Sequence, residues 1–273
     1  MNSVTSIVKR YPLATFFILT YIFSWWGWLV GLGQIPIGPV VAALIVVPLT
    51  EGKAGLKEWA SRIVRWRVGF KWYAIALTLP VALAGAAASL NVLLGAPGLT
   101  LAHLGQQPDL PFEILFVFFI IALGEEPGWR GYALPRLQEG RSALSATLIL
   151  AVFGVIWHVP LFLTGDSPWS IIPIIVAGYI LFTWLFNNTR GSVLIAMILH
   201  TSVGIIGPLI VAPMFSGADL TRYTWLLAAL YSLAGIAVVI LAGPAHLSRR
   251  SEAQLEATGL LAQPQPLASP QQG

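Results

Sequence analysis

The stretch "FEILFVFFIIALGEEPGWRGYA", residues 112–133, is long and apolar enough to cross a membrane, yet its second half carries charges. A helix needs roughly 20 apolar residues to span the hydrocarbon core. Glu125, Glu126 and Arg130 interrupt the run, and each charge in a spanning helix costs about 2.5 to 3.5 kcal/mol on insertion scales. The stretch therefore predicts a membrane helix that contains a polar site.

The rest of the chain has the same apolar character. It has 273 residues, of which 57% are hydrophobic and 10% charged, which is too apolar for a soluble domain of this length. It has no cysteine, which excludes disulfides and thiolate metal ligands. The net charge of +4 fits basic cytoplasmic loops better than a nucleic-acid surface. We therefore expect an integral membrane protein with membrane lipids, and no nucleic acid, as partners.

Hydropathy predicts an all-α fold, a polytopic membrane helix bundle that forms one domain over residues 1–248. Eight segments have the length and composition of spans, namely 13–33, 35–50, 72–95, 112–133, 143–164, 169–188, 191–213 and 223–243. The tail, 249–273, is polar and rich in Pro and Gln, so we expect it to be disordered.

The basic residues predict the orientation. With eight spans and a cytoplasmic N-terminus, 14 of the 15 Lys and Arg residues fall on the cytoplasmic side and Arg222 falls outside. The first apolar run is too long for a cleaved signal peptide. We expect a multi-pass protein of the cell membrane with both termini in the cytoplasm.

One predicted cytoplasmic connection, "KAGLKEWASRIVRWRVGFKW", residues 53–72, is amphipathic. At helical spacing, one face carries Leu56, Trp59, Ala60, Ile63 and Val64, and the other carries Lys57, Glu58, Ser61, Arg62 and Arg65. This pattern predicts a helix in the membrane interface, which serves either as a basic loop that fixes the topology or as a contact for lipid or substrate.

The charges in the opening stretch separate into a pair and a single carboxylate. Glu126 and Arg130 are four residues apart, so they share a helical face and are expected to form a structural ion pair. Glu125 is rotated by about 100° from Glu126, and its carboxylate must face a polar cavity or another helix. Pro127 removes a backbone donor and should distort the helix here.

Two histidines can complete a site with Glu125. His158 and His200 are each the only readily ionisable side chain of their predicted spans. The helical rise places Glu125 and His200 about 12 and 14 Å from the cytoplasmic ends of their spans, and His158 about 20 Å. Glu125 could take a proton from water while the imidazoles position that water or stabilise an oxyanion. The same three residues could instead bind zinc or another divalent metal, and the sequence leaves this choice open.

At these residues the chain resembles a known family, the CAAX prenyl endopeptidases and bacteriocin-processing enzymes, also called the Abi or CPBP intramembrane proteases. "GEEPGWRGYALPRLQ" is similar to the family's EExxxR motif, "WHVPLF" to its second motif and "GSVLIAMILH" to the approach to its third. The resemblance implies peptide-bond hydrolysis in the cytoplasmic half of the membrane, with Glu125 as the catalytic base and His158 and His200 as the motif histidines. It leaves the choice between a glutamate mechanism without metal and a metalloprotease open.

The chain departs from the family pattern at two positions. Gly154 stands where the second motif often has Phe, and Gly204 where the third usually has Asn. The missing Asn removes a donor worth roughly 3 kcal/mol at an oxyanion; Ser202 or Asn187 are candidate replacements. We therefore expect an intramembrane endopeptidase acting on a membrane-associated peptide or protein, with a non-catalytic scaffold or an immunity or binding protein as the alternative. A proton-coupled transporter is a further alternative.

Overall fold

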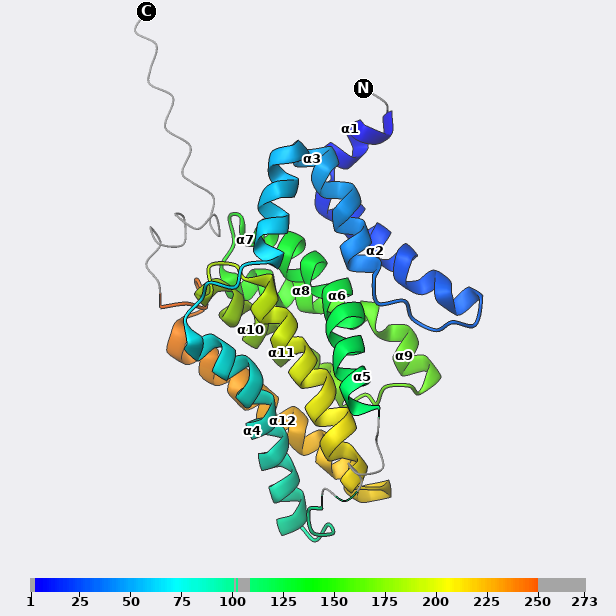
Figure 1. Ribbon diagram of the computed structural model, residues 1–273, viewed down its shortest axis with the longest axis vertical. Helices are drawn as coiled ribbons and strands as arrows, with labels where there is room; N and C mark the ends of the chain where they lie inside the picture. The colour runs from blue at the N-terminus through cyan, green and yellow to red at the C-terminus, as the bar shows by residue number, and fades with distance from the viewer. Residues whose placement is uncertain (1–2, 101, 103–108, 250–273) are drawn as a thin grey trace, which may run out of the picture.

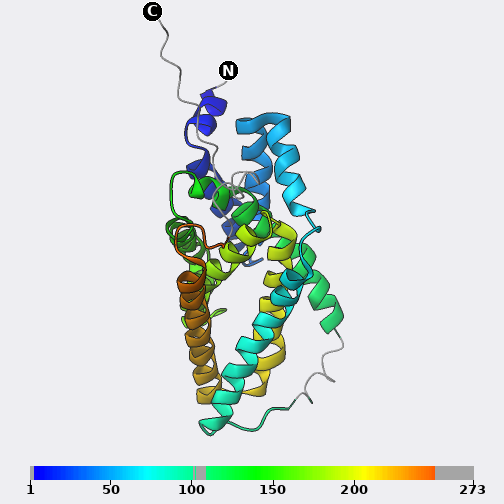
Figure 2. The same ribbon diagram turned by 90° about the vertical axis from the view of Figure 1, so that its left-hand side faces the viewer.

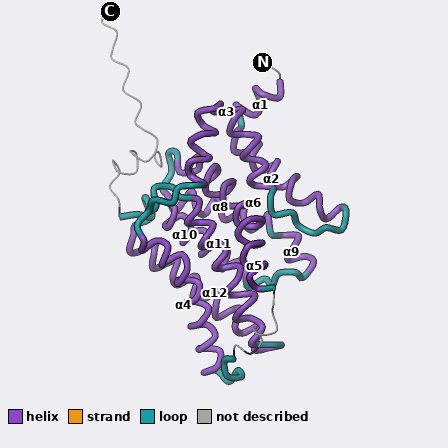
Figure 3. Tube along the Cα trace, viewed as in Figure 1, coloured by secondary structure: helices purple, strands orange, loops and turns teal. Residues whose placement is uncertain are grey.

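The protein is a bundle of helices. The computed structural model describes residues 3–100, 102 and 109–249, and over these ranges it contains helices and loops but no strand (Figure 3). The predicted all-α membrane bundle is therefore confirmed. The predicted disordered tail lies outside the described residues except for Arg249, and the assignment of residues 1–248 to one domain stays a prediction.

The N-terminal region forms three helices at one end of the bundle (Figure 1). It comprises α1 (Ser3–Arg10), α2 (Pro12–Leu29) and α3 (Gly38–Ile63). Proline lies in the first turn of both α2 and α3, where its missing N–H leaves no helical bond unmade. A Cβ atom at Gly38 would overlap with Ser24 Oγ, so glycine is what lets these two helices approach here.

The helix α3 turns back on itself at Gly52. This residue has φ 67° and ψ −157°, a conformation that favours glycine, and Figure 1 shows the second arm returning towards the bundle. The arm corresponds to the predicted amphipathic helix, but its buried face differs. Trp59 is buried as expected, whereas Arg62 is also buried and Val64 is exposed, because the arm packs against protein.

The stretch that opened the sequence is helical from Leu110 to Gln138 but is not one regular helix. It consists of α5 (Leu110–Phe116), η2 (Val117–Ala122), α6 (Leu123–Gly128), η3 (Trp129–Ala133) and α7 (Leu134–Gln138). The segments η2 and η3 are π-helical. They flank the turn that holds Pro127, and such wide turns absorb the hydrogen bond that proline cannot make.

The remaining helices complete the bundle. They are α4 (Phe70–Leu93), α8 (Ala143–Trp157), α9 (Val159–Thr164), α10 (Ile171–Asn188), α11 (Val193–Ile205) with its extensions η4 (Ile206–Val211) and η5 (Ala212–Met214), and α12 (Gly217–Ala242). Figure 2 shows α4 and α12 meeting at the end of the bundle far from α1 and diverging towards the other end. The helix α10 packs between α8 and α12, and α11 packs on α4.

All eight predicted spans coincide with helical segments, but in the described residues only six helices are both long and apolar enough to cross a membrane. The two exceptions have local causes. The 112–133 span is divided by its π-helical turns. The 143–164 span breaks at His158, two residues before Pro160, so α8 has 15 residues and α9 has 6. The protein is a multi-pass membrane protein.

Candidate active site

A large cavity lies inside the helix bundle and gathers the residues predicted to form the site. Its volume is about 1190 Å³, and its lining is mostly apolar. The polar residues of the predicted site all line it: Glu125, Glu126, Arg130, His158 and His200. They come from three regions of the chain, α6–η3, the α8–α9 break and α11, so the fold assembles them around one space.

Glu126 connects two of these residues. Its side chain is fully buried, and its Oε1 atom lies 3.1 Å from Arg130 Nη1 and 2.7 Å from His200 Nδ1. Its Oε2 atom has no hydrogen-bond partner among the described residues. The four-residue spacing predicted an ion pair of Glu126 with Arg130 alone. In the structure, Glu126 also contacts His200.

Aromatic rings hold Arg130 in place. Its guanidinium carbon lies 4.2 Å from the ring centroids of both Tyr179 and Phe182 on α10. Such cation–π contacts are stronger when the charge is desolvated, and Arg130 is 3% exposed. Arg130 therefore links the motif helix to α10 and supplies positive charge beside Glu126.

Glu125 lines the same cavity, and among the described residues it has no ion-pair partner. It is 7% exposed, and Trp129 lies one helical turn further along the chain. The ring of Trp129 packs edge to face on Trp157, with centroids 6.2 Å apart. Glu125 is thus a nearly buried carboxylate at the lining of the cavity.

The two histidines present the same ring nitrogen to the cavity side. His158 Nδ1 lies 2.7 Å from the carbonyl oxygen of Gly154, and a carbonyl can only accept, so Nδ1 carries the proton. His200 Nδ1 likewise donates to the Glu126 carboxylate. In both rings Nε2 is left for a water or a substrate.

The two glycines that depart from the family pattern have different surroundings. A Cβ atom at Gly154 would overlap with the hydroxyl of Tyr179, and one at Gly204 would lie 3.2 Å from Val117 Cγ1. The Tyr179 ring thus fills the space that a side chain at 154 would take, whereas Gly204 lines the cavity. Tyr179 was not predicted as a residue of the site, because a hydroxyl in an apolar span is its only distinguishing feature in the sequence.

Neither candidate replacement for the missing Asn takes its place. Asn187 donates from Nδ2 to Gln138 Oε1 at 2.8 Å and to the carbonyl oxygen of His246, away from the cavity. Ser202 is buried but does not line the cavity formed by the described residues.

The predicted metal set is not assembled. Among the described residues, no group of three or more His, Asp or Glu side chains is arranged to hold a metal ion. Glu125, His158 and His200 therefore share a cavity without forming a coordination sphere.

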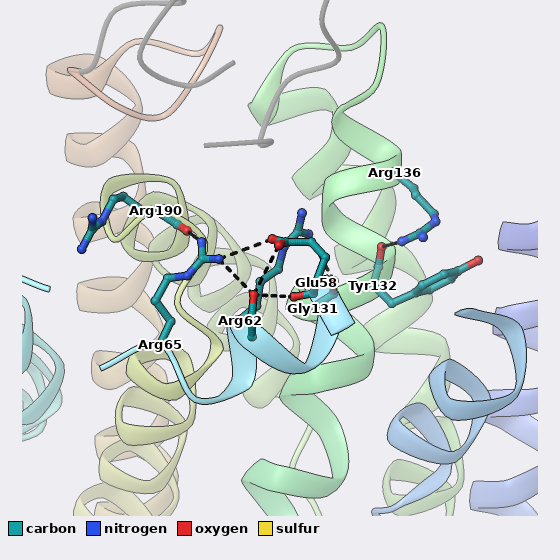
Figure 4. Close-up of polar contacts among 8 residues, drawn as sticks. Glu58, Arg62, Arg65, Gly131, Tyr132, Arg136 and Arg190 are labelled. Carbon is teal, nitrogen blue, oxygen red and sulfur yellow. Dashed lines mark hydrogen bonds and ion pairs between the residues drawn. The ribbon is translucent and has the colours of Figure 1, made fainter. Parts of the chain in front are cut away.

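The returning arm of α3 buttresses the motif helix from outside the cavity. Trp59 Nε1 donates to the carbonyl oxygen of Pro127 at 2.9 Å, and Arg62 Nη1 to that of Gly131 at 3.4 Å. Figure 4 shows Arg62 and Glu58 beside Gly131, and Arg65 donating to the carbonyl oxygen of Arg190. The arm thus anchors the backbone on either side of Arg130.

Comparison with known proteins agrees with this geometry. Residues 107–206 match the family model described as "Type II CAAX prenyl endopeptidase Rce1-like". The resemblance to the CAAX prenyl endopeptidases is confirmed. The chain is also 26% identical over 187 residues to the "CAAX prenyl protease 2" of Methanococcus maripaludis, covering 59% of this chain and 65% of that relative. The matched region thus spans less than two thirds of the relative. Residues 107–206, which match the family model, include Glu125, Glu126, Arg130, His158 and His200.

Proposed function

We propose that the protein is an intramembrane endopeptidase that hydrolyses peptide bonds with a water molecule activated by Glu125. The observation that carries this proposal is that Glu125, His158 and His200, from three separate regions of the chain, line one cavity. Placing an ionisable side chain in apolar surroundings is costly in a membrane protein. Three such side chains that meet at one cavity are typical of a catalytic site.

In the proposed mechanism, Glu125 takes a proton from water, and the resulting hydroxide attacks the carbonyl carbon of the scissile bond. His158 accepts a hydrogen bond from that water at Nε2, because its Nδ1 proton is held by Gly154. His200, supported by Glu126, donates from Nε2 to the oxyanion when both ring nitrogens carry protons. The tetrahedral intermediate then collapses, the C–N bond breaks, and Glu125 returns the proton to the leaving nitrogen.

We propose that this reaction proceeds without a metal cofactor. The supporting observation is that, among the described residues, no three His, Asp or Glu side chains are arranged to hold a metal ion. Metal analysis of the purified protein and activity after chelation test this. Stoichiometric metal whose removal abolishes cleavage would contradict it.

The proposed substrate is a membrane-associated peptide with an apolar portion, because the lining of the cavity is mostly apolar. The name of the archaeal relative suggests the first probe, a peptide ending in a CAAX motif with a farnesyl group on its cysteine. The same peptide without the lipid is the second probe. Faster cleavage of the lipidated peptide would indicate that the apolar region of the cavity binds the lipid. Equal rates would indicate that it binds apolar side chains of the peptide.

We further propose that the protein lies in the cell membrane with both termini in the cytoplasm. The supporting observation is the position of the basic residues. Arg62, Arg65, Arg136 and Arg190 lie in one region of the protein, around Gly131 (Figure 4), while Arg222 pairs with Asp219 at 2.7 Å. Cytoplasmic loops are enriched in Lys and Arg.

The decisive experiment replaces Glu125 with Gln. This substitution keeps the shape and hydrogen bonding but removes the base, so cleavage should fall by about 10³-fold or more while peptide binding persists. Glu113→Gln makes the same chemical change in α5, away from the cavity lining, and should leave cleavage unchanged. Wild-type turnover in Glu125→Gln would overturn the proposed function. A purified wild-type protein that binds both probes but cleaves neither would support the scaffold alternative instead.

A further inference from the structure

The loop between α2 and α3 lies against the catalytic helix. It reverses direction through Gly31 and Gly33, whose φ values are 75° and 70°. Two backbone hydrogen bonds hold it to the end of α2, from Leu32 N to the Gly27 carbonyl oxygen and from Ile35 N to that of Ser24, each 2.9 Å. The loop therefore has a defined position.

The loop and the first turn of α3 pack against two glycines of α6 beside Glu125. A Cβ atom at Gly124 would lie 3.0 Å from the carbonyl oxygen of Pro36, and one at Gly128 would overlap with Pro39. Gly124 immediately precedes Glu125 in the chain. The loop is thus packed against the backbone that carries the proposed base.

Gln34 extends from this loop to the lining of the same cavity. Both polar atoms of its carboxamide, Oε1 and Nε2, are buried, and neither has a hydrogen-bond partner among the described residues. A buried polar group left without a partner costs about 1 to 3 kcal/mol, and native structures tolerate few of them. An amide that is unsatisfied at both ends and faces a cavity is therefore suited to a polar ligand.

Other polar atoms of the cavity lining are also buried without a hydrogen-bond partner among the described residues. The cavity is therefore suited to a ligand that has hydrogen-bonding groups. Trp157 Nε1, Ser170 Oγ and Tyr223 Oη are also buried without a partner within the described residues. Of these side chains, Gln34 offers both a donor and an acceptor from one planar group.

We infer that Gln34 positions the peptide backbone of the substrate. Its Nε2 donates to a carbonyl oxygen and its Oε1 accepts from an N–H of the same extended residue, since these two backbone groups point to the same side of an extended chain. This role rests on the proposed function, because it presumes a peptide in the cavity. It adds a contact that none of the three motifs carries, in a site where Gly204 supplies no side-chain donor.

The test measures binding separately from cleavage. In protein that carries Glu125→Gln, the dissociation constant of the farnesylated CAAX peptide is measured in detergent micelles, with and without Gln34→Met. Methionine has a similar length but no amide, so binding should weaken about 10-fold, equivalent to about 1.4 kcal/mol. Because the amide has no hydrogen-bond partner among the described residues, the midpoint of thermal unfolding should not fall. In the active protein, Gln34→Met should raise KM more than it lowers kcat.

Ester analogues of the peptide identify the contact. Replacing one peptide N–H by oxygen removes a donor at a chosen position. One such ester analogue should bind the protein with Gln34 more weakly than the parent peptide does. The same analogue should bind the Gln34→Met variant no more weakly than the parent peptide does. Gln138→Met is the matched control, because Gln138 pairs with Asn187 outside the cavity; it should leave the ester pattern intact. Equal ester penalties with and without Gln34, or an unchanged dissociation constant in Gln34→Met, would overturn the inference. Retained cleavage by Glu125→Gln would instead overturn the proposed mechanism, and the binding result would stand by itself.

Discussion

Glu126 Oε1 lies 2.7 Å from His200 Nδ1, in hydrogen-bond contact. The two adjacent carboxylates have different surroundings. Glu125 is open to the cavity, while Glu126 is fully buried and holds both a histidine and an arginine. We propose that Glu126 is a positioning residue that would act through the imidazole of His200.

Replacing Glu126 with Gln tests this role. Glutamine can still accept from His200 Nδ1, but it removes the negative charge that supports a protonated ring. We expect kcat to fall about 10-fold to 100-fold with little change in KM. Combining Glu126→Gln with His200→Ala should lower kcat no further than His200→Ala alone, measured with the farnesylated peptide. Multiplying losses would show that the two residues act independently.

The ion pair between Glu126 and Arg130 predicts coupled stability. Removing one partner of a buried pair leaves an uncompensated charge and typically destabilises by about 3 to 5 kcal/mol. We expect Glu126→Gln and Arg130→Met each to lower the thermal midpoint in detergent, and the double variant to recover part of the loss. Recovery should be incomplete, because Arg130 also contacts Tyr179 and Phe182. Strictly additive losses would contradict the pairing.

Gly204 predicts a gain of activity that needs a second change. An Asn side chain at 204 would restore a donor at the cavity, but its Cβ would lie 3.2 Å from Val117 Cγ1, which is tighter than ordinary packing. We expect Gly204→Asn with Val117→Ala to raise kcat by up to about 10²-fold, and Gly204→Asn alone to raise it less. Val117→Ala alone is the control. A double variant no faster than this control would show that the missing donor does not limit turnover.

Reporter fusions test the orientation. Fusions after Lys71, Arg141 and Arg190 should report the cytoplasm, and fusions at Asp166 and Asp219 should report the outside, because cytoplasmic loops carry the basic residues. A cytoplasmic signal at Asp166 would break the predicted arrangement. It would also place the helix break at His158 near the cytoplasmic face of the membrane instead of the outer face.

Hydropathy located helical segments at all eight predicted spans, since each is an apolar run of about 20 residues, but it did not predict α1. It did not reveal that the 112–133 and 143–164 spans are interrupted, because the π-helical turns around Pro127 and the break before Pro160 depend on local backbone geometry. The backward turn at Gly52 was also missed, since many glycines in the chain are compatible with a positive φ and packing selects a few of them.

The residues of the site were predictable by type but not by contact. A charged or imidazole side chain in a spanning segment is costly wherever it lies, which is why Glu125, His158 and His200 stood out. Which carboxylate meets His200 depends on how α6 is rotated against α11, and no periodicity encodes that rotation. Gln34 gave no signal, because a polar residue in a short loop is ordinary.

The arm of α3 is sensitive to Trp59. Because its indole donates to the carbonyl oxygen of Pro127, Trp59→Phe keeps most of the ring volume and removes the bond. We expect stability to fall by about 1 kcal/mol, measured as a lower thermal midpoint. An unchanged midpoint would show that the bond adds nothing.

The turn at Gly52 also sets how much length variation the chain can tolerate. Seven positions separate it from Trp59, and each added residue would rotate the arm beyond it by about 100°. A single insertion between them would carry Trp59 away from Pro127 and bring Glu58 into its place beside the motif helix. Insertions there should be rejected even though Trp59 does not line the cavity.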